Sequence, residues 1–143
     1  MVRIDKYHFP DDLYYEKDHS WAKIEEGGKR VRIGIDDFGQ DIAGKILFIR
    51  IRRAGSVVKQ GRTYASIETG KWVGPLRSPV TGRIVEVNQA LSRKPSLANE
   101  DPYGSAWFII VEPSNLEEDL KNTYHGEAWV EYVKKDIVER LKK

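Results

Sequence analysis

One lysine stands where a side chain could do chemistry. Lys71 follows a strand-like run at 64–68, lies in the Gly- and Pro-rich segment 70–75, and precedes a second strand signal at 83–87. This arrangement predicts a tight bend between strands that holds Lys71 at an exposed tip. A lysine on a rigid tip suits covalent attachment of a mobile cofactor, although an ordinary solvated lysine fits the same position.

Composition predicts a soluble globular domain. The 143 residues are 40% hydrophobic and 32% charged, with a net charge of +2, which predicts no broad contact with nucleic acid or an anionic membrane. The chain has no cysteine, so any sulfur chemistry must come from a bound group. No stretch has the length and apolarity of a membrane helix or signal peptide, and we therefore expect a cytoplasmic protein.

The elements that would position Lys71 are mostly strands. Alternating segments at 21–25 and 31–35 predict a hairpin, and a short helix is expected at 37–43, capped by Asp36 or Asp37 and ended by Gly44. The nearly continuous apolar run at 46–51 predicts a central strand, and 106–111 predicts the last strand. The polar stretch at 89–104 is expected to be an ordered surface loop.

The C-terminal part predicts helices. Ser114 and Glu117 have capping-box spacing, and an apolar stripe recurs at helical spacing in Trp129, Val133, Ile137 and Leu141. We expect that stripe to pack on the sheet. The organisation predicted is a mostly β sandwich or barrel at 1–113, with an N-terminal arm, and a helical extension at 114–143, together forming a single domain.

Five segments of the chain, in order and spacing, resemble the H-protein family of the glycine cleavage system. They are YEKDHSW at 15–21, IGIDDFGQ at 33–40, SPVTG at 78–82, IVEVN at 84–88, and NEDPYG at 99–104 with Trp107 shortly after. The resemblance runs from about Leu13 to the final helix. It implies a barrel-sandwich hybrid, the fold of lipoyl and biotinyl carriers, with two small sheets, a short internal helix and C-terminal helices.

The family's lipoylation site falls on segment 68–72 of this chain. The resemblance therefore implies that lipoate is attached covalently to Lys71 as N6-lipoyllysine. The recognition context implied around it is Glu68, Thr69, Gly70 and Trp72. Gly55 and Gly82, on either side in sequence, match glycines that lipoyl domains use at turns.

The resemblance implies a carrier without catalytic residues or metal of its own. A lipoate–protein ligase or lipoyl transferase would attach the cofactor. The arm would take an aminomethyl group from glycine decarboxylase, pass the carbon to folate on aminomethyltransferase, and be reoxidised by dihydrolipoyl dehydrogenase. Tethering keeps the arm at high local concentration near each enzyme.

A surface cleft for the loaded arm is implied at Asp18, His19, Ser20 and Pro75. Ser20 and Pro75 stand where the family often has acids, and their loss removes charge-assisted hydrogen bonds to a cationic cargo, each about 1.5–3 kcal/mol. With Gly70 and Trp72 beside the lysine, these departures resemble the lipoate-binding proteins of sulfur oxidation that serve a heterodisulfide-reductase-like complex. Both pathways remain open from the sequence.

Three further hypotheses come from other classes. A biotinyl carrier shares the fold but usually has Met on both sides of its lysine, where this chain has Gly70 and Trp72. An unmodified interaction module is a second. An enzyme is the least favoured, because His8, His19 and His125 are scattered without an acid partner nearby in sequence or metal-ligand spacing.

Overall fold

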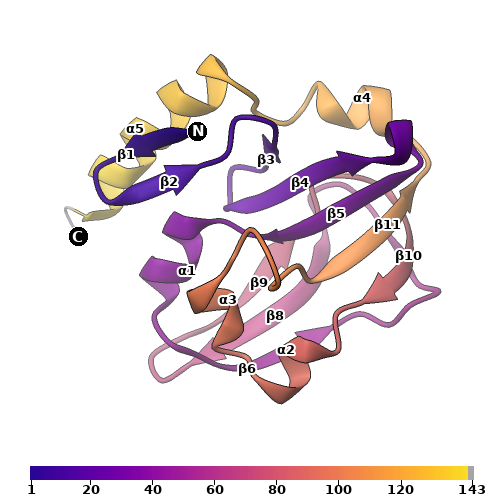
Figure 1. Cartoon of the computed structure of the whole chain (residues 1–143), viewed down its shortest axis with the longest axis horizontal. Helices are drawn as coiled ribbons and strands as arrows, with labels where there is room; N and C mark the ends of the chain where they lie inside the picture. Colours follow the sequence, from indigo (N-terminus) through magenta and orange to yellow (C-terminus); the bar gives the residue numbers. More distant parts are fainter. Residues whose placement is uncertain (142–143) are drawn as a thin grey trace.

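The computed structural model describes residues 1–141 and contains a six-stranded, a three-stranded and a two-stranded antiparallel sheet with helices around them (Figure 1). The six-stranded sheet has the order β3-β4-β5-β11-β10-β7. Its strands are β3 (Tyr14–Tyr15), β4 (Ser20–Glu25), β5 (Arg30–Ile35), β11 (Ile109–Pro113), β10 (Gly82–Val87) and β7 (Val57–Val58). The predicted hairpin is confirmed as β4 and β5, joined through a 3-10 turn at Glu26–Gly28.

The three-stranded sheet carries Lys71 and has the order β6-β8-β9, with β6 (Ile46–Ile51), β8 (Thr63–Thr69) and β9 (Val73–Arg77). The prediction that 46–51 is a central strand is wrong, because β6 lies at an edge and exposes Leu47 and Phe48. The sequence also gave no indication of β9, since Gly74 and Pro75 weaken a strand signal. Pro75 is tolerated because β9 is the other edge strand.

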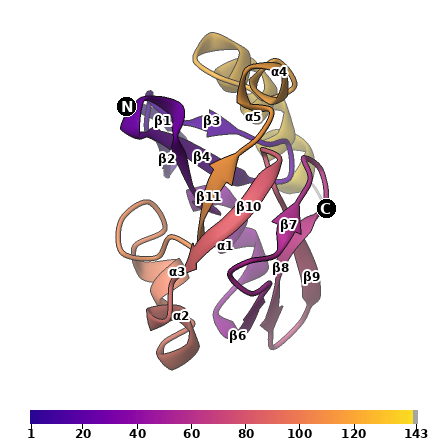
Figure 2. The ribbon, with the colours of Figure 1, turned by 90° about the vertical axis from the view of Figure 1, so that its right-hand side faces the viewer.

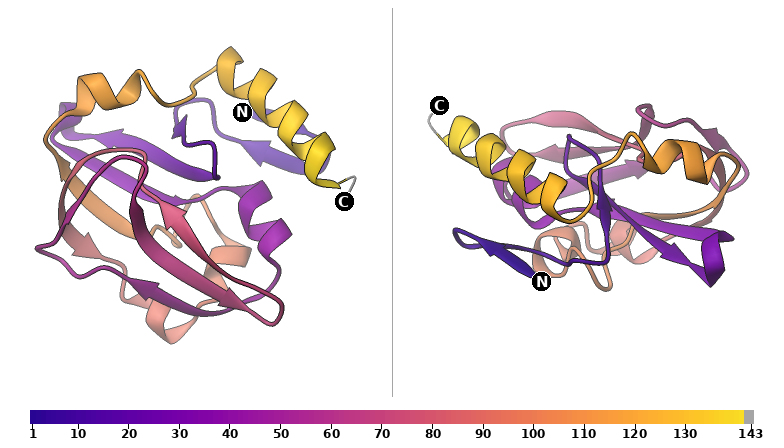
Figure 3. Two further views of the ribbon diagram at one scale, coloured as in Figure 1. Left: turned by 180° about the vertical axis from the view of Figure 1, so that it is seen from behind. Right: turned by 90° about the horizontal axis from the view of Figure 1, so that it is seen from above.

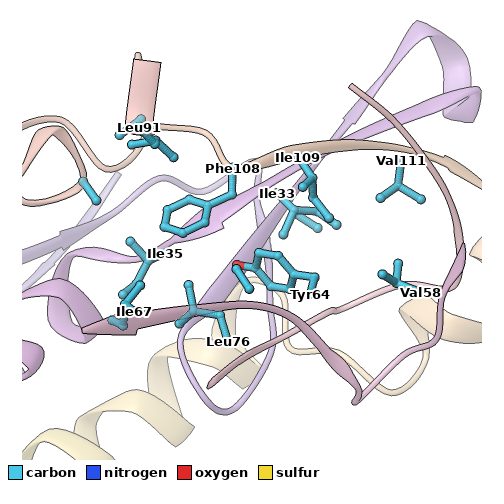
Figure 4. Close-up of a cluster of buried hydrophobic side chains, with 14 of the residues drawn as sticks. Ile33, Ile35, Val58, Tyr64, Ile67, Leu76, Leu91, Phe108, Ile109 and Val111 are labelled. Carbon is cyan, nitrogen blue, oxygen red and sulfur yellow. The ribbon is translucent and has the colours of Figure 1, made fainter. Parts of the chain in front are cut away.

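The two larger sheets pack face to face around the main core (Figures 2 and 4). Buried residues of β8, such as Tyr64 and Ile67, meet Ile33 of β5 and Phe108 across this layer. Burying such side chains is the main favourable term in folding. The expected mostly β sandwich is confirmed, and within residues 1–141 the sheets do not close into a barrel.

Helix α1 (Asp37–Ala43) is confirmed at the predicted position. The Asp36 side chain accepts a hydrogen bond from Gly39 N at 2.8 Å, which caps the first turn. Gly44 ends the helix at a φ of 87°, a conformation that favours glycine.

The connection at 89–104 does more than cover the surface. It contains α2 (Ala90–Arg93) and α3 (Leu97–Glu100), which insert Leu91 and Ala98 fully into the core. Two short apolar pairs, Ala90-Leu91 and Leu97-Ala98, in a polar stretch make too weak a periodic pattern to predict these buried helices. The last strand begins at Ile109, three residues later than expected.

A second core forms where the hairpin of β1 (Val2–Ile4) and β2 (Tyr7–Phe9) meets α5 (Glu127–Leu141), at the upper left of Figure 1 and in both views of Figure 3. Trp129, Val133 and Ile137 are buried as predicted, but Leu141, at the helix end, is 55% exposed. The stripe therefore packs mainly on aromatic side chains of the N-terminal segment rather than on the open face of a sheet.

The helix before α5 departs from the predicted cap. Helix α4 (Leu116–Leu120) has Asn115 as its N-cap residue, without a side-chain capping bond. Asp119 instead accepts a hydrogen bond from Thr81 N at 2.7 Å, which ties α4 to the main domain. In residues 1–141 we find no helix long and apolar enough to cross a membrane.

Candidate functional site

Lys71 projects from the turn between β8 and β9, and its neighbour Thr69 fixes that turn. The buried Thr69 Oγ1 accepts hydrogen bonds from Lys71 N at 3.2 Å and Trp72 N at 3.1 Å, while Thr69 N donates to Trp72 O at 2.8 Å. A threonine hydroxyl that binds backbone two and three residues on stabilises a tight turn. The backbone is held and the Lys71 side chain remains exposed.

Trp72 lies folded back over Gly74 of β9. A Cβ atom on Gly74 would come within 1.9 Å of Trp72 Cζ2, so the absence of a side chain at Gly74 is what allows the indole to lie there. The indole is 47% exposed and forms part of the wall of a cleft next to Lys71.

The cleft has a volume of about 480 Å³ and lies between the β8–β9 hairpin, α1, the N-terminal turn and the end of α5. Its apolar wall consists of Ile35, Ile42, Ala43, Ile67, Trp72, Pro75 and Leu76. Its polar lining consists of Asp18, His19, Arg77 and Arg140. Three of the four expected cleft residues, Asp18, His19 and Pro75, are therefore brought together beside Lys71.

The charges at the cleft are largely paired. Arg77 Nε lies 3.5 Å from Asp18 Oδ2, and Arg140 Nε lies 3.0 Å from Asp136 Oδ2 within α5. Asp18 is the more exposed of the two carboxylates. Asp18 is therefore the more accessible hydrogen-bond acceptor of the two, and it is already paired with the Arg77 guanidinium.

His19 lines the cleft and connects it to α5 through Asp136. Its Nδ1 lies 2.8 Å from Asp36 Oδ2 and its Nε2 lies 2.6 Å from Asp136 Oδ2, while its backbone adopts a φ of 76°. Burial disfavours the imidazolium, but the Asp36 charge and the hydrogen bonds to both carboxylates outweigh this and raise the pKa of His19 to about 9. The doubly protonated ring then donates to both acids, as a structural link rather than a free base.

Ser20 does not lie in the cleft, which corrects the expectation. It is fully buried in the core, with its hydroxyl 3.0 Å from the Tyr64 hydroxyl. As the first residue of β4, Ser20 points inward with the core face of the strand. The position therefore does not offer an open place for a carboxylate in this chain.

A carboxyl group that the sequence did not single out lies across the same turn. Glu16 N donates to Ser20 O at 2.8 Å, and Glu16 Oε1 accepts from Asp18 N at 2.6 Å. Burial is the main reason that the pKa of Glu16 is raised to about 7. The turn that leads into the cleft thus contains a buried acid at 16 in addition to the exposed acid at 18.

The remaining predicted site residues lie on the same hairpin or away from it. Glu68 is exposed on the outer face of β8, paired in register with Phe48 and Val73, and Gly70 lies in the turn. Gly55 occupies a turn at a φ of 94°. Gly82 is not a turn residue: it begins β10, where a Cβ would come within 2.2 Å of Glu112 O on β11.

Sequence reasoning missed two residues of α5: Arg140, which lines the cleft, and Asp136, which pairs with Arg140 and with His19. Their spacing of four on a helix signals a local ion pair. Nothing in the pattern indicates that Asp136 reaches His19, 117 residues earlier in the chain.

The fold and site define a class of protein, the barrel-sandwich carrier domains with a lysine at a hairpin tip. The crystal structure of a glycine cleavage system H protein from Mycobacterium marinum is similar, with a TM-score of 0.74, 30% identity, and coverage of 90% of this chain and 98% of that one.

Sequence comparisons narrow the class to a family. The sequence model of the glycine cleavage H-protein family matches residues 13–136. Glycine cleavage system H protein 2 of Aquifex aeolicus is 43% identical over 94% of this chain and 86% of its own. A probable glycine cleavage system H protein of Pyrococcus abyssi is 39% identical over 94% of this chain and 98% of its own. The chain belongs to the glycine cleavage H-protein family.

Proposed function

We propose that this protein is a lipoyl carrier of the glycine cleavage system, with lipoate attached to Lys71 through an amide bond. The observation that carries the proposal is an exposed lysine on a hydrogen-bonded turn, beside an apolar cleft, in a chain of this family. The protein acts as a carrier and substrate of other enzymes and turns over nothing by itself.

The residues present fit that group. Bound lipoate supplies a cyclic disulfide that takes up and returns an electron pair and a carbon unit. Thr69 holds the attachment point, so that motion is confined to the side chain. Ile42, Ile67 and Trp72 offer apolar surface that suits the hydrocarbon part of an arm folded into the cleft.

Asp18 supplies the charge that a cationic cargo needs. Its carboxylate lines the cleft and is partly exposed, and Arg77 holds it in place at 3.5 Å. An ammonium group arriving at the cleft would compete with Arg77 for this carboxylate. We infer that the cleft holds such cargo through Asp18 and not through position 20.

The comparisons favour glycine cleavage over sulfur oxidation, because the family and the relatives reported above bear glycine cleavage names. The partners that follow are glycine decarboxylase, aminomethyltransferase and dihydrolipoyl dehydrogenase, with a lipoate–protein ligase or lipoyl transferase for the modification.

The first test is the mass of the intact protein after incubation with the lipoylating enzyme of the same organism. The expected result is a gain of one lipoyl group, mapped to Lys71 and abolished in Lys71→Arg. Lys59→Arg, a matched exposed lysine, is expected to retain the gain. Lipoate on Lys59 or Lys94, or a biotinyl mass in protein from the native host, would refute the assignment.

The second test addresses the pathway. Lipoylated protein, mixed with glycine decarboxylase, is expected to support exchange of labelled carbon dioxide with the glycine carboxyl group, and Lys71→Arg is expected to give only background. Exchange no greater than that background with efficiently lipoylated protein would contradict glycine cleavage while leaving the lipoyl assignment intact.

A further inference from the structure

The chain's positive charge is concentrated in the sequence segment that contains Lys71. Residues 45–83 contain nine lysines and arginines and one acid, Glu68, a net charge of +8 in a chain whose total is +2. The rest of the chain therefore carries −6. These 39 residues include the whole β6-β8-β9 sheet, whose strands carry Arg50, Arg77 and Glu68. Most of the positive charge lies in the turns and loops next to these strands, at Lys45, Arg52, Arg53, Lys59, Arg62 and Lys71.

Three arginines of this segment line one groove. Arg50, Arg52 and Arg53 surround a groove of about 480 Å³ whose other polar lining is Ser56, Thr63 and Ser66. All three are exposed, and within residues 1–141 none lies within 4 Å of a carboxylate. Other exposed arginines, such as Arg140, do form ion pairs. The groove thus offers guanidinium groups without internal partners.

An apolar patch lies between the groove and Lys71. Phe48 and Val73 flank Glu68 in register on the outer face of the sheet and are 64% and 65% exposed. The next outward row is Arg50, Ser66 and Pro75. Going along this face from the Lys71 turn, one meets apolar side chains first and arginines next, which resembles the apolar centre and polar rim of a protein interface.

We propose that this outer face, Phe48 and Val73 with Arg50, Arg52 and Arg53, is the docking surface for the lipoylating enzyme, and that the enzyme presents acidic side chains to the arginines. The inference rests on the proposed function. An enzyme that forms a bond at Lys71 must contact its turn, and a standard interface of about 800 Å² per partner extends well beyond one turn. The outer face of the sheet adjoins that turn.

Docking brings Lys71 to the site where the enzyme transfers the lipoyl group to it. The enzyme supplies lipoate activated as an acyl-adenylate. The neutral Lys71 Nζ attacks the acyl carbon, the N–C bond forms, and the C–O bond to AMP breaks. AMP leaves with the electron pair, and the amine releases a proton to solvent. The arginine face affects how often the two proteins meet in register and takes no part in the bond changes.

A protein partner fits this face better than a polyanion does. Glu68 lies between Phe48 and Val73, where it would repel a phosphate backbone or an anionic membrane. Arginine also matches carboxylates through paired hydrogen bonds. Two exposed apolar side chains are matched by an apolar patch on a protein.

The experiment measures kcat/KM for lipoylation by the enzyme of the same organism, with lipoate and ATP, from low to high salt. Arg52→Glu with Arg53→Glu is expected to lower kcat/KM about tenfold or more at low salt and to approach wild type near 0.5 M salt, where charges are screened. The control, Lys134→Glu with Lys135→Glu, makes the same change in net charge on exposed positions of α5 and is expected to stay within about twofold.

A second pair of variants tests the apolar part. Phe48→Ser is expected to lower kcat/KM at every salt concentration, whereas Val138→Ser, at a position on α5 that is also more than half exposed, is expected to leave it unchanged. Thermal melts of all variants show that each is folded before the kinetics are compared.

Three results would overturn the docking surface. The first is an equal loss of kcat/KM in both charge-reversed pairs, and the second is no loss of kcat/KM in either pair. The third is that Arg52→Glu with Arg53→Glu weakens binding to duplex DNA or anionic vesicles while lipoylation is unchanged. Wild-type protein that is not lipoylated at all would instead refute the proposed function.

Discussion

Two regions of this protein are built in opposite ways. One end of the molecule is formed by β1, β2 and α5, which lie side by side (Figure 3). It buries stacked aromatic rings, with the rings of Tyr15 and Trp129 4.5 Å apart, and His19 is held there by Asp36 and Asp136. The β6-β8-β9 sheet has its inner face in the core, but its outer face exposes arginines and apolar side chains together with Lys71.

In this carrier, the residues that stabilise the fold and the residues that expose Lys71 to other proteins therefore lie in different regions. Packing and buried charge pairs fix the cleft from the α5 side, where Asp136 and Arg140 arrive. On the other side, the hydrogen bonds of Thr69 fix the backbone at Lys71, while its side chain is exposed. A substitution should therefore cost stability in the first region and recognition in the second, and the following predictions test that contrast.

The largest expected effect is on the aromatic end. Trp129→Ala should lower the free energy of unfolding by about 3–5 kcal/mol, because it removes a buried ring stacked on Tyr15. Trp72→Ala, in the other region, should change it by less than about 1 kcal/mol, since that ring is half exposed. Urea denaturation measures both. Equal losses would mean that the two regions do not differ as described.

The next effect is pH-dependent and lies at His19. Its pKa in the folded state is raised to about 9, so the stabilisation is complete below the unfolded value of about 6.5 and is lost as pH rises through about 9. We expect roughly 3 kcal/mol to disappear across that window in wild type. His19→Asn, which tolerates the positive φ, should be less stable at pH 6 and show little change from pH 6.5 to 9.

The measurement is the free energy of unfolding at a series of pH values. Asp136→Asn serves as the companion variant, because it removes one acid of the link without changing the backbone at His19. A wild-type curve that is flat between pH 6.5 and 9 would show that His19 is not the charged link inferred here.

A smaller effect of opposite sign is expected at Glu16, where a substitution should raise the free energy of unfolding. Its pKa is raised to about 7, so the folded state disfavours the carboxylate, and stability falls as pH rises from the unfolded value through about 7. The difference from the unfolded value of 4.5 corresponds to about 3 kcal/mol at pH 8. Glu16→Gln should recover about 1–2 kcal/mol of it, because an amide oxygen accepts the hydrogen bond from Asp18 N less strongly than a carboxylate does. At pH 4 the two proteins should unfold at nearly the same urea concentration; a difference there as large as at pH 8 would contradict burial as the cause.

The smallest effect on stability is expected at Gly74. Gly74→Ala should displace the Trp72 indole from its place over β9, at a cost below about 1 kcal/mol, because a flexible side chain can move away. Tryptophan emission should shift to longer wavelength as the ring becomes more hydrated. The same substitution in a Trp72→Phe background should produce no shift; a shift there would place the change at another tryptophan.

Sequence reasoning found the elements whose signals are local. The β4–β5 hairpin, α1 with its Asp36 cap, and the buried face of α5 through Trp129, Val133 and Ile137 follow from alternation, capping chemistry and helical spacing. It failed where the competing signal was tertiary. The apolar run of β6 predicts burial, yet an edge position leaves Phe48 exposed, and β9 forms despite Gly74 and Pro75.

The candidate site divides in the same way. The position of Lys71 in a turn and its resemblance to a family's modification site are properties of a few consecutive residues. The set of side chains that surround Lys71 does not depend on consecutive residues. Ser20 turns into the core towards Tyr64, while Arg140, paired with Asp136, reaches the cleft from the last helix.

By itself, then, the sequence determined a mostly β carrier fold, the family, and the lysine at the hairpin tip, because each depends on the order and spacing of neighbouring residues. Only the tertiary structure decided that His19 is held between Asp36 and Asp136, which lie 17 and 117 residues after it, and that Arg50, Arg52 and Arg53 line one groove. Burial and proximity are set by how distant segments pack, and a linear pattern does not contain those distances.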